Sequence, residues 1–194
     1  MSCSVLFPLA AALAAVVPVA ALAAKPAAPL ANHGVALPPL PNPPGDIPDS
    51  QVFVLYYSPL GFSLKVPEGW ARRAGGESVR FTSAYDGLSV TVTPAAAAPT
   101  VASVRSGQAA ALAQTTMAVR VSAIQAVTLP GGDAVHIVFA SNSEPNPVTG
   151  KAVRQENEQF LFWRQGRLAT VTLWAPYGAD NADQWRLISR SFRW

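Results

Sequence analysis

The chain has 194 residues, of which 13% are charged and 50% are hydrophobic, and its formal net charge at pH 7 is +3. This length is enough for one domain with a substantial hydrophobic core and short for two. The longest basic run is Arg72-Arg73, so the sequence predicts no clustered cationic surface for a nucleic acid.

The N-terminal residues have the pattern of a secretory signal peptide. From Val5 to Ala24 no side chain is charged or strongly polar, and the run ends in the small–x–small sequence "ALA" at 21–23. We therefore predict a signal peptide at residues 1–23 and export to the periplasm or the extracellular space. The alternative is an uncleaved membrane anchor, because the run is also long enough to cross a bilayer.

Cysteine usage excludes several kinds of chemistry. Cys3 is the only cysteine, and it precedes the apolar run instead of following it, which excludes a lipid-attachment site. The mature chain would contain no thiol, and hence no disulfide, zinc–thiolate site, iron–sulfur cluster or cysteine nucleophile. The sequence also contains neither a Gly-x-Ser-x-Gly motif nor a glycine-rich phosphate loop, so no cofactor is expected.

A proline-rich segment follows the apolar run. Residues 25–50 contain eight prolines and show no hydrophobic periodicity. Proline removes backbone donors and favours extended conformations, so residues 24–50 are predicted to form a disordered linker. Residues 51–194 are predicted to form a single domain.

Strand-like alternation dominates the first half of this domain. Apolar and polar residues alternate with period two, which is typical of half-buried antiparallel strands, in "FSLKV" (62–66), "VRFTS" (79–83) and "LSVTVT" (88–93). Tyr85-Asp86-Gly87 predicts the turn between the last two strands, because Asp-Gly tolerates positive φ.

A helix is then expected over residues 100–117. Thr100 is a suitable N-cap, and Val101, Val104 and Leu112 recur at helical spacing. Gly107 counts against an uninterrupted helix, since glycine costs roughly 1 kcal/mol relative to alanine in a helix interior.

The second half of the domain reads as a β-meander. Its strands are "RVSAIQAVTL" (120–129), "AVHIVFA" (134–140), "VRQENEQFLFWR" (153–164) and "LATVTLW" (168–174). Pro130-Gly131-Gly132 and Gln165-Gly166 are hairpin turns, whereas a longer loop joins the second and third strands. Together with the helices, this order predicts an α+β domain.

The last fifteen residues, 180–194, are expected to form a C-terminal helix with Asp180 or Asn181 as its cap. Its apolar face is expected to cover a sheet. Arg186, Arg190 and Arg193 form a stripe on another face, and this stripe is interpreted as solvated, with the binding of an anionic partner as the alternative.

The stretch "GFSLKVPEGW", which ends in Pro67-Glu68-Gly69-Trp70, resembles the opening strand of the PsbP-like superfamily. The order hairpin, helix, meander and C-terminal helix ending in "ISRSFRW" is similar to that superfamily as well. The resemblance spans residues 61–194. It implies an antiparallel β-sheet packed between helical layers, an α/β/α sandwich, and it carries no catalytic residues.

His136, Glu156 and Glu158 are the candidate residues for chemistry. The hairpin turns predict Phe162 opposite Ala169, and the longer loop suggests His136 near Glu158 and Val138 near Glu156, all on one sheet face. An imidazole between two carboxylates would suit a general base or a metal site. The favoured interpretation is structural, because a long connection fixes register poorly and a slip of one residue reverses the face.

The sequence therefore predicts an exported, non-enzymatic binding or accessory domain of the cell envelope that binds a protein partner or a small ligand. No catalytic residue, metal or cofactor is assigned. The alternatives are a hydrolase or metal-dependent enzyme centred on His136, Glu156 and Glu158, and a structural subunit of a membrane complex.

Overall fold

The computed structural model describes Met1 and residues 34–194. The strands are β1 (Phe53–Tyr57), β2 (Ser63–Pro67), β3 (Ala71–Gly75), β4 (Ser78–Thr82), β5 (Gly87–Pro94), β6 (Arg120–Leu129), β7 (Gly132–Asn142), β8 (Arg154–Arg164) and β9 (Arg167–Pro176). The helices are α1 (Val101–Ser106), α2 (Gln108–Thr115) and α3 (Ala182–Ser191).

Within these residues, seven strands form one antiparallel sheet in the order β3-β4-β5-β9-β8-β7-β6, and β1 pairs with β2 in a separate hairpin. The period-two pattern produces strands such as β4 and β5, in which alternate residues are buried on one side of the sheet. At the β8–β9 turn, Gln165 and Gly166 have φ of 48° and 78°, as a two-residue hairpin requires. The predicted pairing of Phe162 with Ala169 is confirmed.

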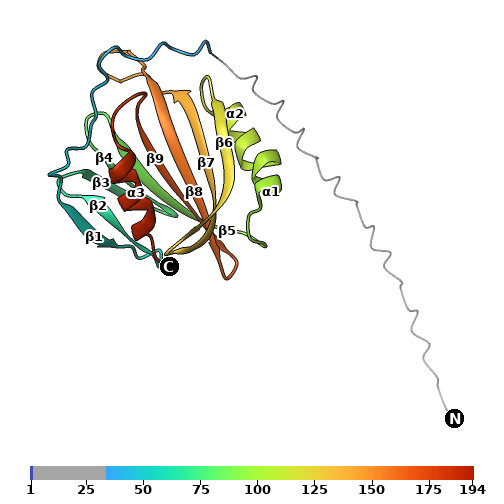
Figure 1. Cartoon of the computed structure of the whole chain (residues 1–194). Helices are drawn as coiled ribbons and strands as arrows, with labels where there is room; N and C mark the ends of the chain where they lie inside the picture. The colour runs from blue at the N-terminus through green and yellow to red at the C-terminus, as the bar shows by residue number, and fades with distance from the viewer. Residues whose placement is uncertain (2–33) are drawn as a thin grey trace.

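The helices lie on both faces of the main sheet. On one face, α3 and the β1–β2 hairpin pack over β5, β8 and β9 around residues such as Phe162 and Phe192. On the other face, α1 and α2 cover Ile137 and Leu161. Figure 1 shows α3 crossing in front of the strands and α1 and α2 beside β6. The chain is thus an α+β fold dominated by antiparallel sheet, with short helices covering parts of each face.

The helix predicted over residues 100–117 is divided at Gly107. Thr100 caps α1 as expected, and its side chain forms a reciprocal capping box with Ser103. Gly107 then leaves helical geometry with φ −103° and ψ −88°, and α2 begins at the next residue. An uninterrupted helix was therefore the wrong prediction, and the glycine is the reason.

The predicted C-terminal helix also ends early, at Ser191. Phe192 turns to extended geometry with φ −57° and ψ 135°, and Arg193 then exchanges two backbone hydrogen bonds of 2.8 Å with Ser63. The C-terminal residues thus add a short bridge beside β2. Because the helix stops before Arg193, the predicted stripe of three arginines is not one helix face.

Residues 34–50 pack on the domain, so this part of the predicted disordered linker is wrong. Ile47 is 4% exposed and belongs to the main core. The Asn181 amide accepts a hydrogen bond from the Ile47 N–H and donates one to the Gly45 carbonyl. Side chains of the domain thus bind the backbone of a segment that has no ladder partners of its own. Figure 1 shows the segment running along the domain.

The predicted signal peptide, residues 1–23, and the first ten residues of the predicted linker lie outside the described part of the chain, apart from Met1. None of the helices within residues 34–194 has the length and apolar character needed to cross a membrane.

Candidate functional site

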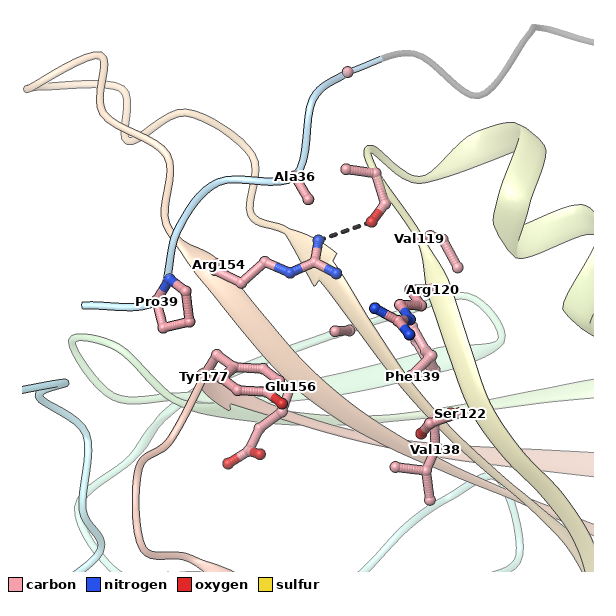
Figure 2. Close-up of a pocket in the computed structure, with 13 residues that line it drawn as sticks. Ala36, Pro39, Val119, Arg120, Ser122, Val138, Phe139, Arg154, Glu156 and Tyr177 are labelled. Atoms are coloured by element: carbon pink, nitrogen blue, oxygen red, sulfur yellow. Dashed lines mark hydrogen bonds between the residues drawn. The ribbon is translucent and has the colours of Figure 1, made fainter. Parts of the chain in front are cut away.

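A cavity of about 850 Å³ lies at one end of the main sheet. Figure 2 shows the side chains that line it. The beginnings of β6 and β8 and the end of β7 line it, because antiparallel neighbours bring these ends to one edge of the sheet. Residues 34–39 and Tyr177, which follows β9, complete the lining. The proline-rich segment thus helps to form this site.

The lining of the cavity combines an apolar surface with a few polar groups. Pro39, Val138 and Ala140 are among its apolar residues, whereas Arg120, Arg154, Glu156 and Tyr177 supply charge or hydrogen-bonding groups. A largely apolar lining with a few placed polar groups is typical of small-molecule sites.

Arg154 is the most unusual group in this cavity. Its side chain comes from the first residue of β8 and is 7% exposed. One guanidinium nitrogen, Nη1, donates to the Ala118 carbonyl at 2.7 Å and to Oδ1 of Asn142 at 3.2 Å. Within residues 34–194 no carboxylate lies within 4.0 Å of it. The charge is therefore buried without an acidic partner, which is costly unless other groups offset it.

Arg120 adds a second cation to the same cavity. Burial lowers the pKa of the Arg154 guanidinium, Tyr177 acts in the opposite direction, and the charge of Arg120 lowers this pKa further. Arg120 itself is exposed and makes no salt bridge within residues 34–194. Two arginines thus share one side of the cavity, and no acid among the described residues is paired with either of them.

Glu156 is the acidic residue that lines the cavity. Burial raises the pKa of its carboxyl group, the charge of Glu158 raises it further, and a hydrogen bond from the Gly178 backbone lowers it. In Figure 2 its carboxylate points away from Arg154 and Arg120, on the side of Tyr177. The cavity therefore separates its cations from its acid.

His136 and Glu158 contact each other, which was one of the geometries suggested by the sequence. The Nε2 atom of His136 lies 3.0 Å from Oε2 of Glu158, and Nδ1 lies 3.3 Å from Nε2 of Gln125. The imidazole ring also stacks on Phe160, with centroids 4.3 Å apart and planes 3° apart. Both ring nitrogens and one ring face are thus occupied, as suits a structural histidine.

The register behind this contact differs from the predicted one by two residues. His136 lies opposite Phe160, whereas Val138 lies opposite Glu158 and Ala140 opposite Glu156. The face is nevertheless the expected one, because a shift of two residues preserves the side of the sheet. The length of the loop between β7 and β8 was therefore not sufficient to predict the register of these two strands.

The three candidate residues do not form a metal-binding group. Among the described residues, no set of three His, Cys, Asp or Glu side chains is arranged to hold a metal ion. His136 pairs with Glu158, and Glu156 lies in the cavity beside the Gly178 backbone. What the pair offers chemically is a hydrogen-bonded imidazole, not a three-ligand site.

The arginines of the C-terminal region occupy a different surface. Arg186 forms an exposed salt bridge of 3.0 Å with Asp183. Arg190 and Arg193 border a shallow groove together with Leu55 and Leu187. Binding of an anionic partner through Arg186, Arg190 and Arg193 stays a prediction, and charge reversal of all three arginines would test it.

Sequence reasoning missed Arg154, Arg120 and Tyr177. One signal was available for Arg154, because it precedes Glu156 and Glu158 by two and four residues and so lies on the same strand face. No comparable signal marks Arg120 or Tyr177, because each reaches the cavity from another segment of the chain.

Comparisons with known proteins define the class of fold. No family model matches the chain, and no curated protein matches its sequence. Among solved structures, the chain is similar to cyanobacterial PsbP (CyanoP) from Synechocystis sp. PCC 6803, with 15% identity and a TM-score of 0.52 over 77% of this chain and 98% of that one. The fold is therefore PsbP-like, as the sequence motif indicated.

Two further structures have TM-scores below 0.5. A protein from Bacteroides thetaiotaomicron has 9% identity and a TM-score of 0.47 over 72% of this chain, which spans 47% of that protein's length. LpqN of Mycobacterium tuberculosis, described as involved in cell envelope biogenesis, has 16% identity and a TM-score of 0.44 over 74% of this chain and 90% of LpqN.

Proposed function

We propose that the chain is an exported, non-enzymatic binding domain of the cell envelope, and that its cavity beneath residues 34–39 holds a small ligand. The apolar run that ends in "ALA" at 21–23 supports export. The cavity is the single observation that supports binding: its volume of about 850 Å³ falls within the range typical of ligand sites.

The segment over the cavity gives this proposal its structural logic. Asn142 accepts a hydrogen bond from the Leu37 N–H at 3.1 Å and donates one to the Val35 carbonyl at 3.0 Å. Arg154 donates to the same Asn142 side chain. The Asn142 amide therefore connects residues 34–39 to Arg154. A ligand that contacts either of them would also strengthen the hydrogen bonds of the other.

Export has a direct test. The full chain, with a C-terminal tag, is produced in a Gram-negative host, and the protein of the periplasmic fraction is subjected to N-terminal sequencing. We expect a mature N-terminus at Ala24. Protein that stays in the cytoplasm with Met1 intact would contradict export, and membrane-bound protein with Met1 intact would favour the uncleaved anchor.

Ligand binding is tested by filling the cavity. Ala140→Trp places an indole against its floor, and Ala102→Trp adds the same group on the exposed side of α1 as the control. Small molecules released from each purified protein after denaturation are then compared by mass spectrometry. We expect a compound that is released from the wild type and the control and depleted at least about tenfold in Ala140→Trp. Equal release from all three proteins would contradict the proposal.

The contact between His136 and Glu158 is what favours the rival proposal, a hydrolase or metal-dependent enzyme. A triple variant with His136→Gln, Glu156→Gln and Glu158→Gln separates the two. We expect the variant to lose stability, and we expect no activity of the wild type to depend on these three side chains. An activity that is present in the wild type and absent from the folded triple variant would favour the enzyme.

A further inference from the structure

The two arginines of the cavity require an explanation beyond ligand binding in general. Arg154 is nearly buried, Arg120 is its neighbour, and within residues 34–194 neither forms a salt bridge. Two guanidinium groups that converge on a cavity repel each other and cost stability. A third group of opposite charge would remove that cost.

We propose that the ligand of this cavity carries an oxyanion, a carboxylate or a phosphate, which Arg154 and Arg120 bind together, while the apolar part of the ligand lies on Val138, Ala140 and Pro39. This inference rests on the proposed function, because it names the chemical class of the ligand for the same cavity. Arginine binds such oxyanions in a planar, charge-assisted geometry that a single lysine ammonium does not reproduce.

The unused donors of Arg154 agree with this assignment. Both of its hydrogen bonds, to Ala118 and Asn142, use Nη1. Within residues 34–194, Nε and Nη2 of Arg154 have no hydrogen-bond acceptor. Neither atom is fully buried, so both can donate to a ligand. In Figure 2 the guanidinium lies between Ala36 and Arg120 at the wall of the cavity. Its bonds to Ala118 and Asn142 hold these free N–H groups in place, so little side-chain entropy is lost when a ligand binds.

Glu156 supplies the one carboxylate among the described residues that line the cavity, and it does not block an anion there. The Glu156 carboxylate points away from the two guanidinium groups in Figure 2. Burial also raises the pKa of Glu156, so the ionised form of this carboxyl group is less favoured than in an exposed glutamate. The arginine side of the cavity therefore keeps a positive potential.

A purely structural Arg154 would account for its bonds to Ala118 and Asn142 but not for Arg120. Arg120 makes no side-chain hydrogen bond and no salt bridge within the described residues, so its replacement leaves those two bonds in place. Arg120→Gln therefore probes the oxyanion site without removing the structural contacts of Arg154. Arg105→Gln, at an exposed position of α1 outside the cavity, is the matched control.

The test is a calorimetric titration of the mature full chain with three probes of one shape: 4-phenylbutanoate, 4-phenylbutyl phosphate and 4-phenylbutan-1-ol. We expect at least one of the two anions to bind about tenfold more tightly than the alcohol, and which one does so distinguishes carboxylate from phosphate. Arg120→Gln should weaken binding of that anion about fivefold or more and leave the alcohol unchanged, whereas Arg105→Gln should change neither. The advantage of the anion should shrink as salt is added.

Two results would overturn the inference. If the alcohol binds as tightly as both anions and Arg120→Gln does not change the affinity, the proposed oxyanion site is wrong. The proposed function is unaffected by that result if Ala140→Trp still prevents binding in the cavity. If no probe binds at millimolar concentration, the inference is wrong for this class of ligand. The mass-spectrometric comparison of released compounds then tests, independently, whether the cavity binds a ligand. Binding that Ala140→Trp does not affect would contradict both proposals.

Discussion

The imidazole of His136 and the carboxylate of Glu158 are joined diagonally across two strands, with 3.0 Å between Nε2 and Oε2. The residue directly opposite His136 is Phe160, on which its ring lies flat. The Glu158 carboxylate therefore contacts a histidine that is not its direct partner in the sheet and whose ring is already stacked on Phe160. Glu158 is 28% exposed and the histidine 11%, so water screens the contact only in part.

This arrangement predicts a measurable coupling between the two residues. His136→Ala should destabilise the fold by roughly 1–3 kcal/mol, because it removes both the stack on Phe160 and the partner of Glu158. In a double-mutant cycle with Glu158→Ala, measured by urea unfolding, we expect a coupling of roughly 0.5–1.5 kcal/mol.

The control for this cycle pairs His136→Ala with Asp133→Ala, since Asp133 lies on the same strand and bonds to Thr128 instead. Additive effects are expected there. Additive effects in the His136–Glu158 cycle as well would show that the 3.0 Å contact contributes nothing to stability.

Asp86 gives the fold a dependence on pH. Burial raises the pKa of its carboxyl group from 3.8 to about 6, the Ser83 hydroxyl lowers it, and the charge of Asp46 raises it. Its Oδ1 atom is buried without a hydrogen-bond partner within the described residues. Folding thus favours the neutral, protonated carboxyl group. The contribution of Asp86 to the stability of the fold is fully present below pH 3.8 and is lost as the pH rises through about 6.

The expected loss is roughly 2–3 kcal/mol of unfolding free energy between pH 4 and pH 7.5. Asp86→Asn stays neutral throughout, so its unfolding free energy should lack this decline, and urea unfolding at several pH values measures both slopes. Asp133→Asn, in the β6–β7 hairpin, should keep the slope of the wild type. Parallel slopes for the wild type and Asp86→Asn would contradict the assignment.

Much of the strand order was predictable because half-buried strands carry a period-two pattern. The β8–β9 register was predictable too, since Gln165-Gly166 leaves one way to close a two-residue turn. The β7–β8 register was not, because the loop between those strands permits several alignments. The strands β1 and β3 were missed: β3 is exposed at every position, so no apolar face marks it.

The cavity itself was beyond sequence reasoning. Its formation depends on contacts between distant segments, such as the Leu37–Asn142 bond across 105 residues. A proline-rich segment without periodicity contains no local signal for such a contact. The face of Arg154 was predictable from its spacing to Glu156, but whether that face is covered depends on where residues 34–39 and Tyr177 lie.

Asn181 should be essential for holding the proline-rich segment on the domain. It is 2% exposed, and its amide bonds to the Ile47 N–H at 2.7 Å and to the Gly45 carbonyl at 2.8 Å. Asn181→Ala leaves both backbone groups without partners, which should cost roughly 2–3 kcal/mol. Limited proteolysis should then cleave near residue 47 much faster than in the wild type.

Asn146→Ala provides the comparison, because this amide also bonds to backbone N–H groups, those of Val148 and Thr149, but within an exposed loop. It should leave cleavage near residue 47 unchanged. Equal protection of that segment in wild type and Asn181→Ala would mean that the burial of Ile47 alone holds the segment in place.

Gly87 should tolerate no side chain, because Trp174 lies across it. The two residues are paired between β5 and β9, and a Cβ atom at position 87 would lie 1.8 Å from the nearest atom of the indole ring. Trp174 also forms a cation–π contact with Arg80, whose guanidinium carbon lies 4.3 Å from the ring centroid. Gly87→Ala must therefore move the ring or the strand, and we expect the free energy of unfolding, measured in urea, to fall by roughly 2 kcal/mol or more.

Gly75→Ala is the control, because no atom lies within 4 Å of the added carbon. It should change the free energy of unfolding by less than about 1 kcal/mol. Similar small effects at both positions would show that the indole moves aside freely and that its stack with Arg80 adds little to stability.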